Sequence, residues 1–400
     1  MPDSSRAKSI YRDDYTTTAD VVMETKKERV YGIDLFRFFA AFLVVGVHVF
    51  RVSVDMDPAN GSDAAYFISS FFYAVLFCAV NCFGIISGYV GYNDNGTYPK
   101  VSNLLVFWGQ AVFYRFLGYI ISSTKGLSSF SHFMLCFFPV TKGNNWYLIA
   151  FFEMMLLMAP GINSIVKHSS RRMNFRMLCW VFILTSVFSL TKGFLFSNPF
   201  ALNDGYSAIW LGILFFYGAS IRKFGWLQRI EKRKGFLLCL SILLFMAIWR
   251  TFVPKILQVL IHVPKGRDFW YDYTSPAIVL LAVTLLISFE KMKIPVKLIP
   301  TVQRLSATTF GIFILHVTVF DSVIRPCIRP IIELPAVIQP FAALMATFFI
   351  VILCLLLDMI RDQIFKWLKL RKGADAIERL LWNFLIGIEN KVCCTGGVFR

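Results

Sequence analysis

YGIDLFRFFAAFLVVGVHVF, residues 31–50, is the stretch that decides the fold. It is long and apolar enough to cross a bilayer as a helix, yet it contains Asp34, Arg37 and His48. An ionised arginine in the middle of a membrane span costs at least about 2.5 to 3.5 kcal/mol on insertion scales, so Arg37 should face the protein interior or a wet cavity. These polar groups predict a buried site inside a membrane protein.

The composition of the whole chain agrees with this interpretation. Its 400 residues are 57% hydrophobic, include 42 Phe and have a mean hydropathy of +0.62, which is outside the range of soluble domains. The sequence therefore predicts an all-α fold, a polytopic membrane helix bundle with about ten transmembrane helices. The apolar runs lie near residues 31–50, 66–92, 103–123, 145–166, 177–196, 206–221, 235–252, 273–289, 306–324 and 337–360.

The formal charge of +17 is mainly a topology signal. About 29 of the 41 basic residues fall on one side, in alternate loops at 167–176, 222–234 and 291–304, in the tail after Arg361, in the N-terminal tail and in the Lys100 loop. Because cytoplasmic loops of membrane proteins collect Lys and Arg, we expect both termini in the cytoplasm. The chain has no nucleic-acid motif, so we expect no nucleic-acid partner.

The flanking segments predict a three-part organisation. Residues 1–30 are polar and lack the apolar core of a signal peptide, so we expect a cytoplasmic N-terminal tail. Residues 31–365 form the transmembrane domain, and residues 366–400 form a basic cytoplasmic tail with an amphipathic helix on the inner membrane surface. Residues 125–144 predict a re-entrant or interfacial piece. The nine Cys follow no metal-binding or disulfide spacing, so we expect no metal.

The spacing of the three polar groups in the first span predicts a shared helix face. Eleven residues at about 100° each bring His48 to within about 20° of Arg37, about 16 Å away along the axis. Both side chains could therefore line one passage, and Asp34, one turn before Arg37, can pair with it. The simpler alternatives are a structural Asp34–Arg37 clasp and a histidine at the membrane interface.

Four stretches, in order along the chain, carry a family resemblance. They are IDLFRFFAAFLVVGVHVF (33–50), NCFGIISGYVGY (81–92), NNWYLIAFFEMMLLMAPGIN (144–163) and LSATTFGIFILHVTVF (305–320), with FFYGASIRKF (215–224) as a weaker fifth. They resemble motifs of the membrane-bound acyltransferase 3 family, and the part from Gly88 to Asn163 is most similar to members encoded with surface polysaccharide synthesis. Where other members have an Arg cluster after the second stretch, NDNGTYPKVSN carries only Lys100.

The resemblance implies a multi-pass enzyme of the bacterial plasma membrane, surrounded by the lipid bilayer. Its reaction would be O-acyl transfer, most often of acetyl, from acetyl coenzyme A as co-substrate to a hydroxyl of a cell-surface or lipid-linked saccharide. Polysaccharide-synthesis proteins would be its partners. Two alternatives from other classes are a transporter or flippase for a lipid-linked sugar and a noncatalytic partner in an envelope polysaccharide complex.

The resemblance also marks residues for that reaction. A neutral imidazole can accept a hydroxyl proton near neutral pH, so His48 is the candidate base, with His316 as the second candidate. Arg37, next to Asp34, could hold a donor phosphate or carbonyl or stabilise developing negative charge. The remaining binding candidates are expected to face the bundle, with Glu153 as a partner for Arg115 or Arg37; they are Trp146, Tyr147, Glu153 and Arg115. For the two aromatic residues the alternative is a belt at the membrane surface, and for His316 it is a structural histidine.

Overall fold

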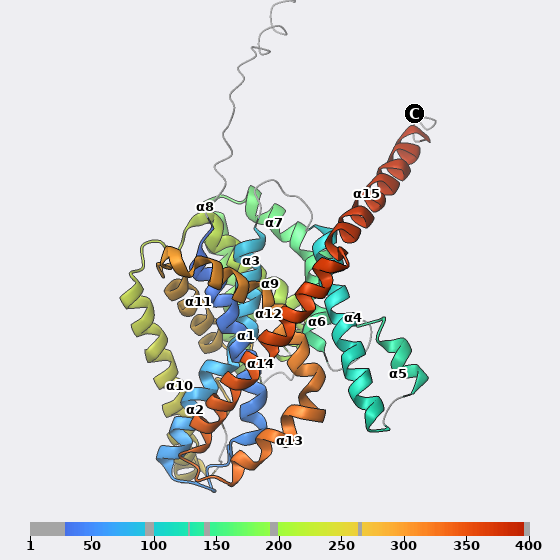
Figure 1. Cartoon of the computed structure of the whole chain (residues 1–400). Helices are drawn as coiled ribbons and strands as arrows, with labels where there is room; N and C mark the ends of the chain where they lie inside the picture. Colours follow the sequence, from blue (N-terminus) through green and yellow to red (C-terminus); the bar gives the residue numbers. More distant parts are fainter. Residues whose placement is uncertain are drawn as a thin grey trace, which may run out of the picture. The chain divides into compact units, whose positions relative to one another are not determined.

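The computed structural model describes residues 29–92, 100–126, 129–139, 145–192, 199–262 and 266–395. The chain divides into two units at residues 30 and 31, and the unit from Tyr31 onward contains the helices. Across the described ranges the regular secondary structure is helical and contains no strand, so the predicted all-α class is confirmed (Figure 1). The predicted N-terminal tail lies, except for its last two residues, outside the described ranges.

The helices agree with the apolar runs of the sequence. In chain order the α-helices are α1 (Tyr31–Ser53), α2 (Asp63–Phe77), α3 (Ala79–Gly91), α4 (Val101–Thr124), α5 (Phe130–Leu135), α6 (Trp146–Glu153), α7 (Ala159–His168), α8 (Arg171–Phe182), α9 (Ala208–Phe224), α10 (Lys232–Ile261), α11 (Pro276–Glu290), α12 (Ile299–Val319), α13 (Arg325–Ile328), α14 (Gln339–Trp367) and α15 (Leu370–Thr395). Single π-helical turns at Met154–Met158, Ile183–Val187 and Phe320–Ile324 continue α6, α8 and α12.

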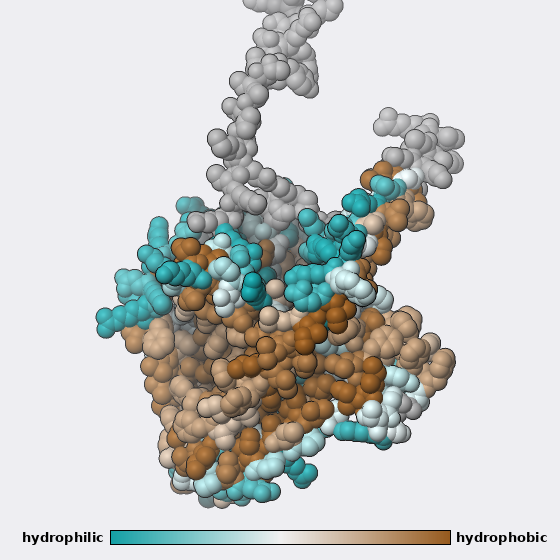
Figure 2. Space-filling view, in the orientation of Figure 1, coloured by the Kyte–Doolittle hydropathy of each residue, from teal (hydrophilic) through white to brown (hydrophobic). Residues whose placement is uncertain are grey.

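Eight helical segments in the described part of the chain are long and apolar enough to cross a membrane. The two remaining predicted runs coincide with α9, which has 17 residues, and α11, which has 15. Figure 2 shows apolar side chains over the middle of the visible face and hydrophilic ones gathered at its two ends. This pattern is that of a polytopic membrane bundle.

Helix α1 lies in the core of the bundle, where it packs against α2, α3, α11, α12 and α14. Its side chains at Phe36, Ala40 and Val45 are fully buried. The neighbouring pair α3 and α9 is also tightly packed, because a methyl group at Gly88 would overlap the carbonyl of Phe215. Gly88, in the stretch NCFGIISGYVGY, therefore permits close contact between the two helices.

A buried ion pair within α14 is linked to α4 by the hydroxyl of Tyr114. Arg361 donates to both carboxylate oxygens of Asp358 at 2.8 and 2.7 Å, and the Tyr114 hydroxyl donates to the same carboxylate at 2.6 Å. Asp358 and Arg361 are 0% and 3% exposed. Because each charge is compensated and hydrogen-bonded, we assign this cluster a structural role.

The C-terminal segment forms one helix, α15, whose first residue is Leu370. The Glu378 carboxylate accepts the backbone N–H of Val101 at 2.8 Å, which connects α15 to the first turn of α4. The predicted boundary between residues 365 and 366 falls inside the last turn of α14. The helix predicted in this tail is therefore present, and its place on the inner membrane surface stays a prediction.

Candidate active site

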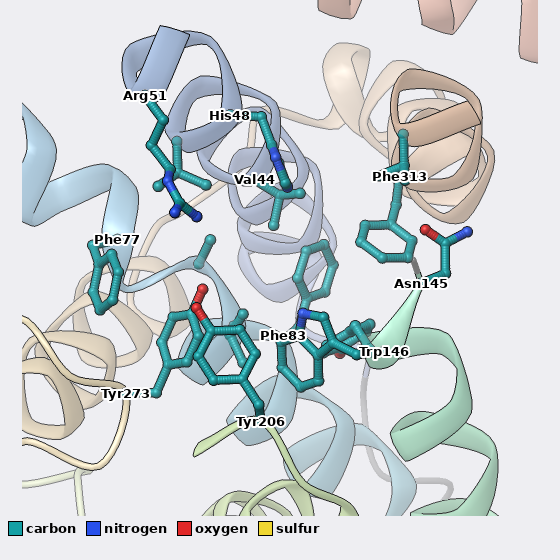
Figure 3. Close-up of a pocket in the computed structure, with 15 residues that line it drawn as sticks. Val44, His48, Arg51, Phe77, Phe83, Asn145, Trp146, Tyr206, Tyr273 and Phe313 are labelled. Carbon is teal, nitrogen blue, oxygen red and sulfur yellow. The ribbon is translucent and has the colours of Figure 1, made fainter. Parts of the chain in front are cut away.

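A cavity of about 100 Å³ surrounds His48 (Figure 3). Its wall combines residues of α1, α3, α6 and α12 with residues of the two loops that precede α9 and α11. His48 and Arg51 extend into it from α1, one turn apart. On the opposite side lie the rings of Trp146, Tyr206 and Tyr273.

The structure brings His48 next to His316, which lies 268 positions later in the sequence. Their ring centroids are 5.3 Å apart, and Phe320 packs against His48 at 5.5 Å. His316 is fully buried, and its Nδ1 lies 3.0 Å from the carbonyl oxygen of Ile312. A carbonyl only accepts, so Nδ1 carries the proton and Nε2 of the neutral ring has a lone pair. Within the described ranges Nε2 has no hydrogen-bond partner, so it is available to a neighbouring donor.

Arg51 is a cavity residue that the sequence analysis did not identify. It lines the cavity with His48, and its side chain is exposed. It has no hydrogen bond or ion pair with any residue that the structure describes. Its position could have been predicted from the sequence. Arg51 follows His48 by three residues, and residues three positions apart share a helix face.

Aromatic rings form most of the wall opposite α1. The Trp146 ring lies 4.6 Å from that of Tyr206, the Tyr206 ring lies 5.0 Å from that of Tyr273, and the Tyr273 ring stacks on Phe77 at 4.7 Å. Trp146 was predicted to face the bundle, and it lines the cavity. Tyr206 and Tyr273 were not predicted as site residues; each is the first residue of an apolar run predicted to span the membrane, and in the structure each lies in the loop just before a helix.

Polar contacts fix the two loops that carry these tyrosines. Lys192 bridges them, with ion pairs to Asp204 at 2.6 Å and Asp272 at 3.0 Å. Burial opposes the charge on Lys192, but hydrogen bonds to the two carboxylates outweigh that effect and raise the pKa of the lysine. The backbone of Tyr273 is held by Asn81, whose amide donates to its carbonyl at 2.8 Å. These contacts hold the two tyrosines of the aromatic wall in place.

A second and larger cavity of about 740 Å³ adjoins the first. Arg37 and Lys100 line it, together with polar side chains of α4 and α12. Both cavities share three aromatic residues in their walls, namely Phe83, Tyr147 and Phe313. The Tyr147 and Phe313 rings are 5.2 Å apart. Arg37 and His48 thus lie on one helix but in separate, neighbouring cavities.

Asp34 lies one turn before Arg37 and is 5% exposed. The Ser306 hydroxyl donates to its carboxylate at 3.1 Å, which links α1 to α12. Ser306 also lines the larger cavity beside Arg37. Asp34 therefore lies beside the larger cavity, and its hydrogen bond to Ser306 helps to fix α1, the helix that carries Arg37.

Two predicted site residues lie away from these cavities. Glu153 is exposed, and no ion pair joins it to a residue in the described ranges. Arg115 donates to the carbonyl of Pro139 at 3.5 Å, near α5. The expectation that Glu153 faces the bundle is wrong. The structure likewise does not bring Arg115 to either cavity.

Comparison with protein families matches an acyltransferase domain to residues 30–359, most of the 400-residue chain. This range contains Arg37, His48 and His316 and all the residues that line the two cavities around them. Neither a curated protein nor a solved structure gives a significant match. The family match therefore rests on the part of the chain that builds the candidate site.

Proposed function

The chain belongs to the acyltransferase 3 family, and from this premise we propose which reaction this multi-pass membrane acyltransferase performs. It transfers an acyl group, in the first instance acetyl, from a coenzyme A thioester to a hydroxyl of a cell-surface or lipid-linked saccharide. The observation that carries the proposal is the pair of adjoining cavities, one lined by His48, whose ring lies 5.3 Å from that of the buried His316, and one lined by two cations. We place the enzyme in a bacterial plasma membrane.

The larger cavity suits the donor. Its volume of about 740 Å³ is within the usual range for cofactor-sized ligands. Arg37 and Lys100 would hold phosphate oxygens, Arg37 through a planar fork and Lys100 as a point charge. Apolar side chains such as Phe107 and Phe151 line the rest and suit the uncharged arm of coenzyme A. With the predicted topology, this cavity receives the donor from the cytoplasm.

The smaller cavity suits the transfer step. His48 would remove the proton from the acceptor hydroxyl as its oxygen attacks the thioester carbon, and the carbon–sulfur bond then breaks. The proton held by His48 passes to the departing thiolate, so the products are an ester and free coenzyme A. His316 would act as a positioning residue, because its Nε2 can accept an N–H from His48 and leave the other His48 nitrogen free as the base.

The test measures release of coenzyme A and transfer of label by the purified full chain with acetyl-labelled acetyl coenzyme A and extracted surface glycan. We expect release that depends on both glycan and His48, and that persists in His132→Ala, the matched control. His132 is exposed on α5 and lines neither cavity. Sugar transport without coenzyme A release would refute the proposal and favour a flippase.

A further inference from the structure

We propose that Arg51 binds an anionic group of the acceptor, so that the preferred acceptor is a saccharide with a carboxylate or phosphate near the acylated hydroxyl. The inference rests on the proposed function and adds the substrate class to it. The smaller cavity has a positive charge and no negative one among its described lining residues. No Asp or Glu is among the described residues that line this cavity, and Arg51 is its cation.

The guanidinium of Arg51 is positioned to meet a ligand. It extends into the cavity toward the rings of Tyr206 and Tyr273 (Figure 3). An arginine in the last turn of a helix commonly serves the helix carbonyls or reaches toward water. Here no hydrogen bond joins Arg51 to α1 or to any other described residue. The acidic residues of this region have other partners: Asp321 is paired with Arg325 at 2.7 Å, and Asp55 accepts a hydrogen bond from the Asn60 amide at 2.8 Å. The five N–H donors of Arg51 are therefore available to an anion.

The other groups of the cavity are those that bind sugars. The Trp146, Tyr206 and Tyr273 rings present apolar faces with polar edges, which suit the C–H face of a pyranose and its hydroxyl groups. Asn145, 8% exposed, has a side-chain oxygen without a hydrogen-bond partner in the described part of the chain, and it also lines the cavity. An amide acceptor of this kind suits a sugar hydroxyl. A cation, an amide oxygen and aromatic faces together fit an acidic sugar.

The spacing on α1 connects the anion to the reacting hydroxyl. Arg51 follows His48 by three residues, which is about 4.5 Å along the helix axis. An anion on Arg51 therefore places a hydroxyl of the same or the adjacent sugar ring at His48. The cavity volume of about 100 Å³ is smaller than a typical whole-ligand pocket, so it receives the reacting part of a glycan while the remainder lies outside.

The test uses the full chain in lipid nanodiscs, acetyl-labelled acetyl coenzyme A, and glycan extracted from cells that lack the gene. One portion of the glycan stays intact, a second has its carboxylates reduced to alcohols, and a third has its phosphates removed. For wild type we expect kcat/KM to fall about 10- to 100-fold on one of the two treated glycans, the usual value of a hydrogen bond to a charged group. The treatment that lowers it identifies the anion.

Arg51→Ala should give, on all three glycans, the low kcat/KM that wild type shows on the sensitive one, mainly through a higher KM. Arg51→Lys should lie in between, because it keeps the charge without the planar fork. The matched control is Lys125→Ala. Lys125 is a cation of the same end of the bundle that donates to the Ser322 carbonyl and lines neither cavity, so its loss should leave both constants unchanged.

Equal use of all three glycans by wild type would overturn the inference, as would normal use of the intact glycan by Arg51→Ala. A loss of kcat at unchanged KM on every glycan would also overturn it, because Arg51 would then act on the reaction itself. If Arg51→Ala cannot be purified, the same kinetic constants are measured for Arg51→Gln, which has a long polar side chain and no charge. Normal use of the intact glycan by Arg51→Gln would likewise overturn the inference. Failure of wild type to label any glycan would instead refute the proposed function.

Discussion

The contact between the two histidines allows a double-mutant cycle with worked magnitudes. If His48 is the base, His48→Ala should lower the transfer rate by roughly 10² to 10⁴, which corresponds to about 3 to 5 kcal/mol of transition-state stabilisation. His316 contributes one hydrogen bond to His48 in this scheme, worth about 1 kcal/mol. His316→Phe, which removes the acceptor nitrogen, should therefore lower the rate by roughly fivefold to tenfold.

The coupling of the two changes is the decisive quantity. Because His316 would act only through His48, His316→Phe should have no further effect in the His48→Ala background. His316→Gln is the matched variant, since its amide oxygen can still accept a hydrogen bond and should preserve part of the rate. The Ile312 carbonyl keeps its place in the helix in each case, because the histidine is an additional donor to it.

The assay measures single-turnover acyl transfer by purified variants at saturating donor, with donor affinity measured separately. Donor affinity should stay near wild type in all variants, since neither histidine lines the larger cavity. Effects of His48→Ala and His316→Phe that simply add would refute the positioning role of His316. A His48→Ala variant with weaker donor binding but an unchanged maximal rate would assign His48 to binding instead of proton transfer.

Two further predictions concern the donor side and the topology. Arg37→Lys keeps the charge but loses the planar fork, so donor affinity and activity should fall at least about tenfold while membrane insertion stays normal; near-normal turnover would mean that the charge alone suffices or that Arg37 is a structural clasp. A reporter fused after Arg400 should be active only in the cytoplasm, because basic residues are concentrated in alternate loops. A signal from the other side would reverse the assignment of the two cavities.

The helices and part of the site could be predicted because they depend on local patterns. The apolar runs mark the helices, since each span must be apolar over most of its length. The shared face of Arg37 and His48 follows from helix geometry, and both residues line cavities. The meeting of His48 with His316 has no local signal, so only the family resemblance indicated a common site.

The remaining site residues depend on tertiary packing. Tyr206 and Tyr273 stand at the start of predicted apolar runs, but the structure places them in loops that Lys192 connects through Asp204 and Asp272, and such a long-range contact has no local pattern. Arg51 had a usable signal in its spacing from His48. The orientation of Glu153 was wrong because composition shows that a charge lies in a span without showing which face of the helix meets its neighbours.

The arrangement of the wall between the cavities determines which parts must move during transfer. Arg37 and His48 are about 16 Å apart on a helix that is packed on several sides, so their separation is fixed. With the donor phosphates held at Arg37, the thioester end extends toward His48 along the shared rings of Phe83, Tyr147 and Phe313, where the two cavities meet. These rings come from α3, α6 and α12, so side-chain rotation can open a path without moving α1. In the proposed reaction, α1 therefore fixes the positions of donor and acceptor, while the three aromatic rings control contact between them.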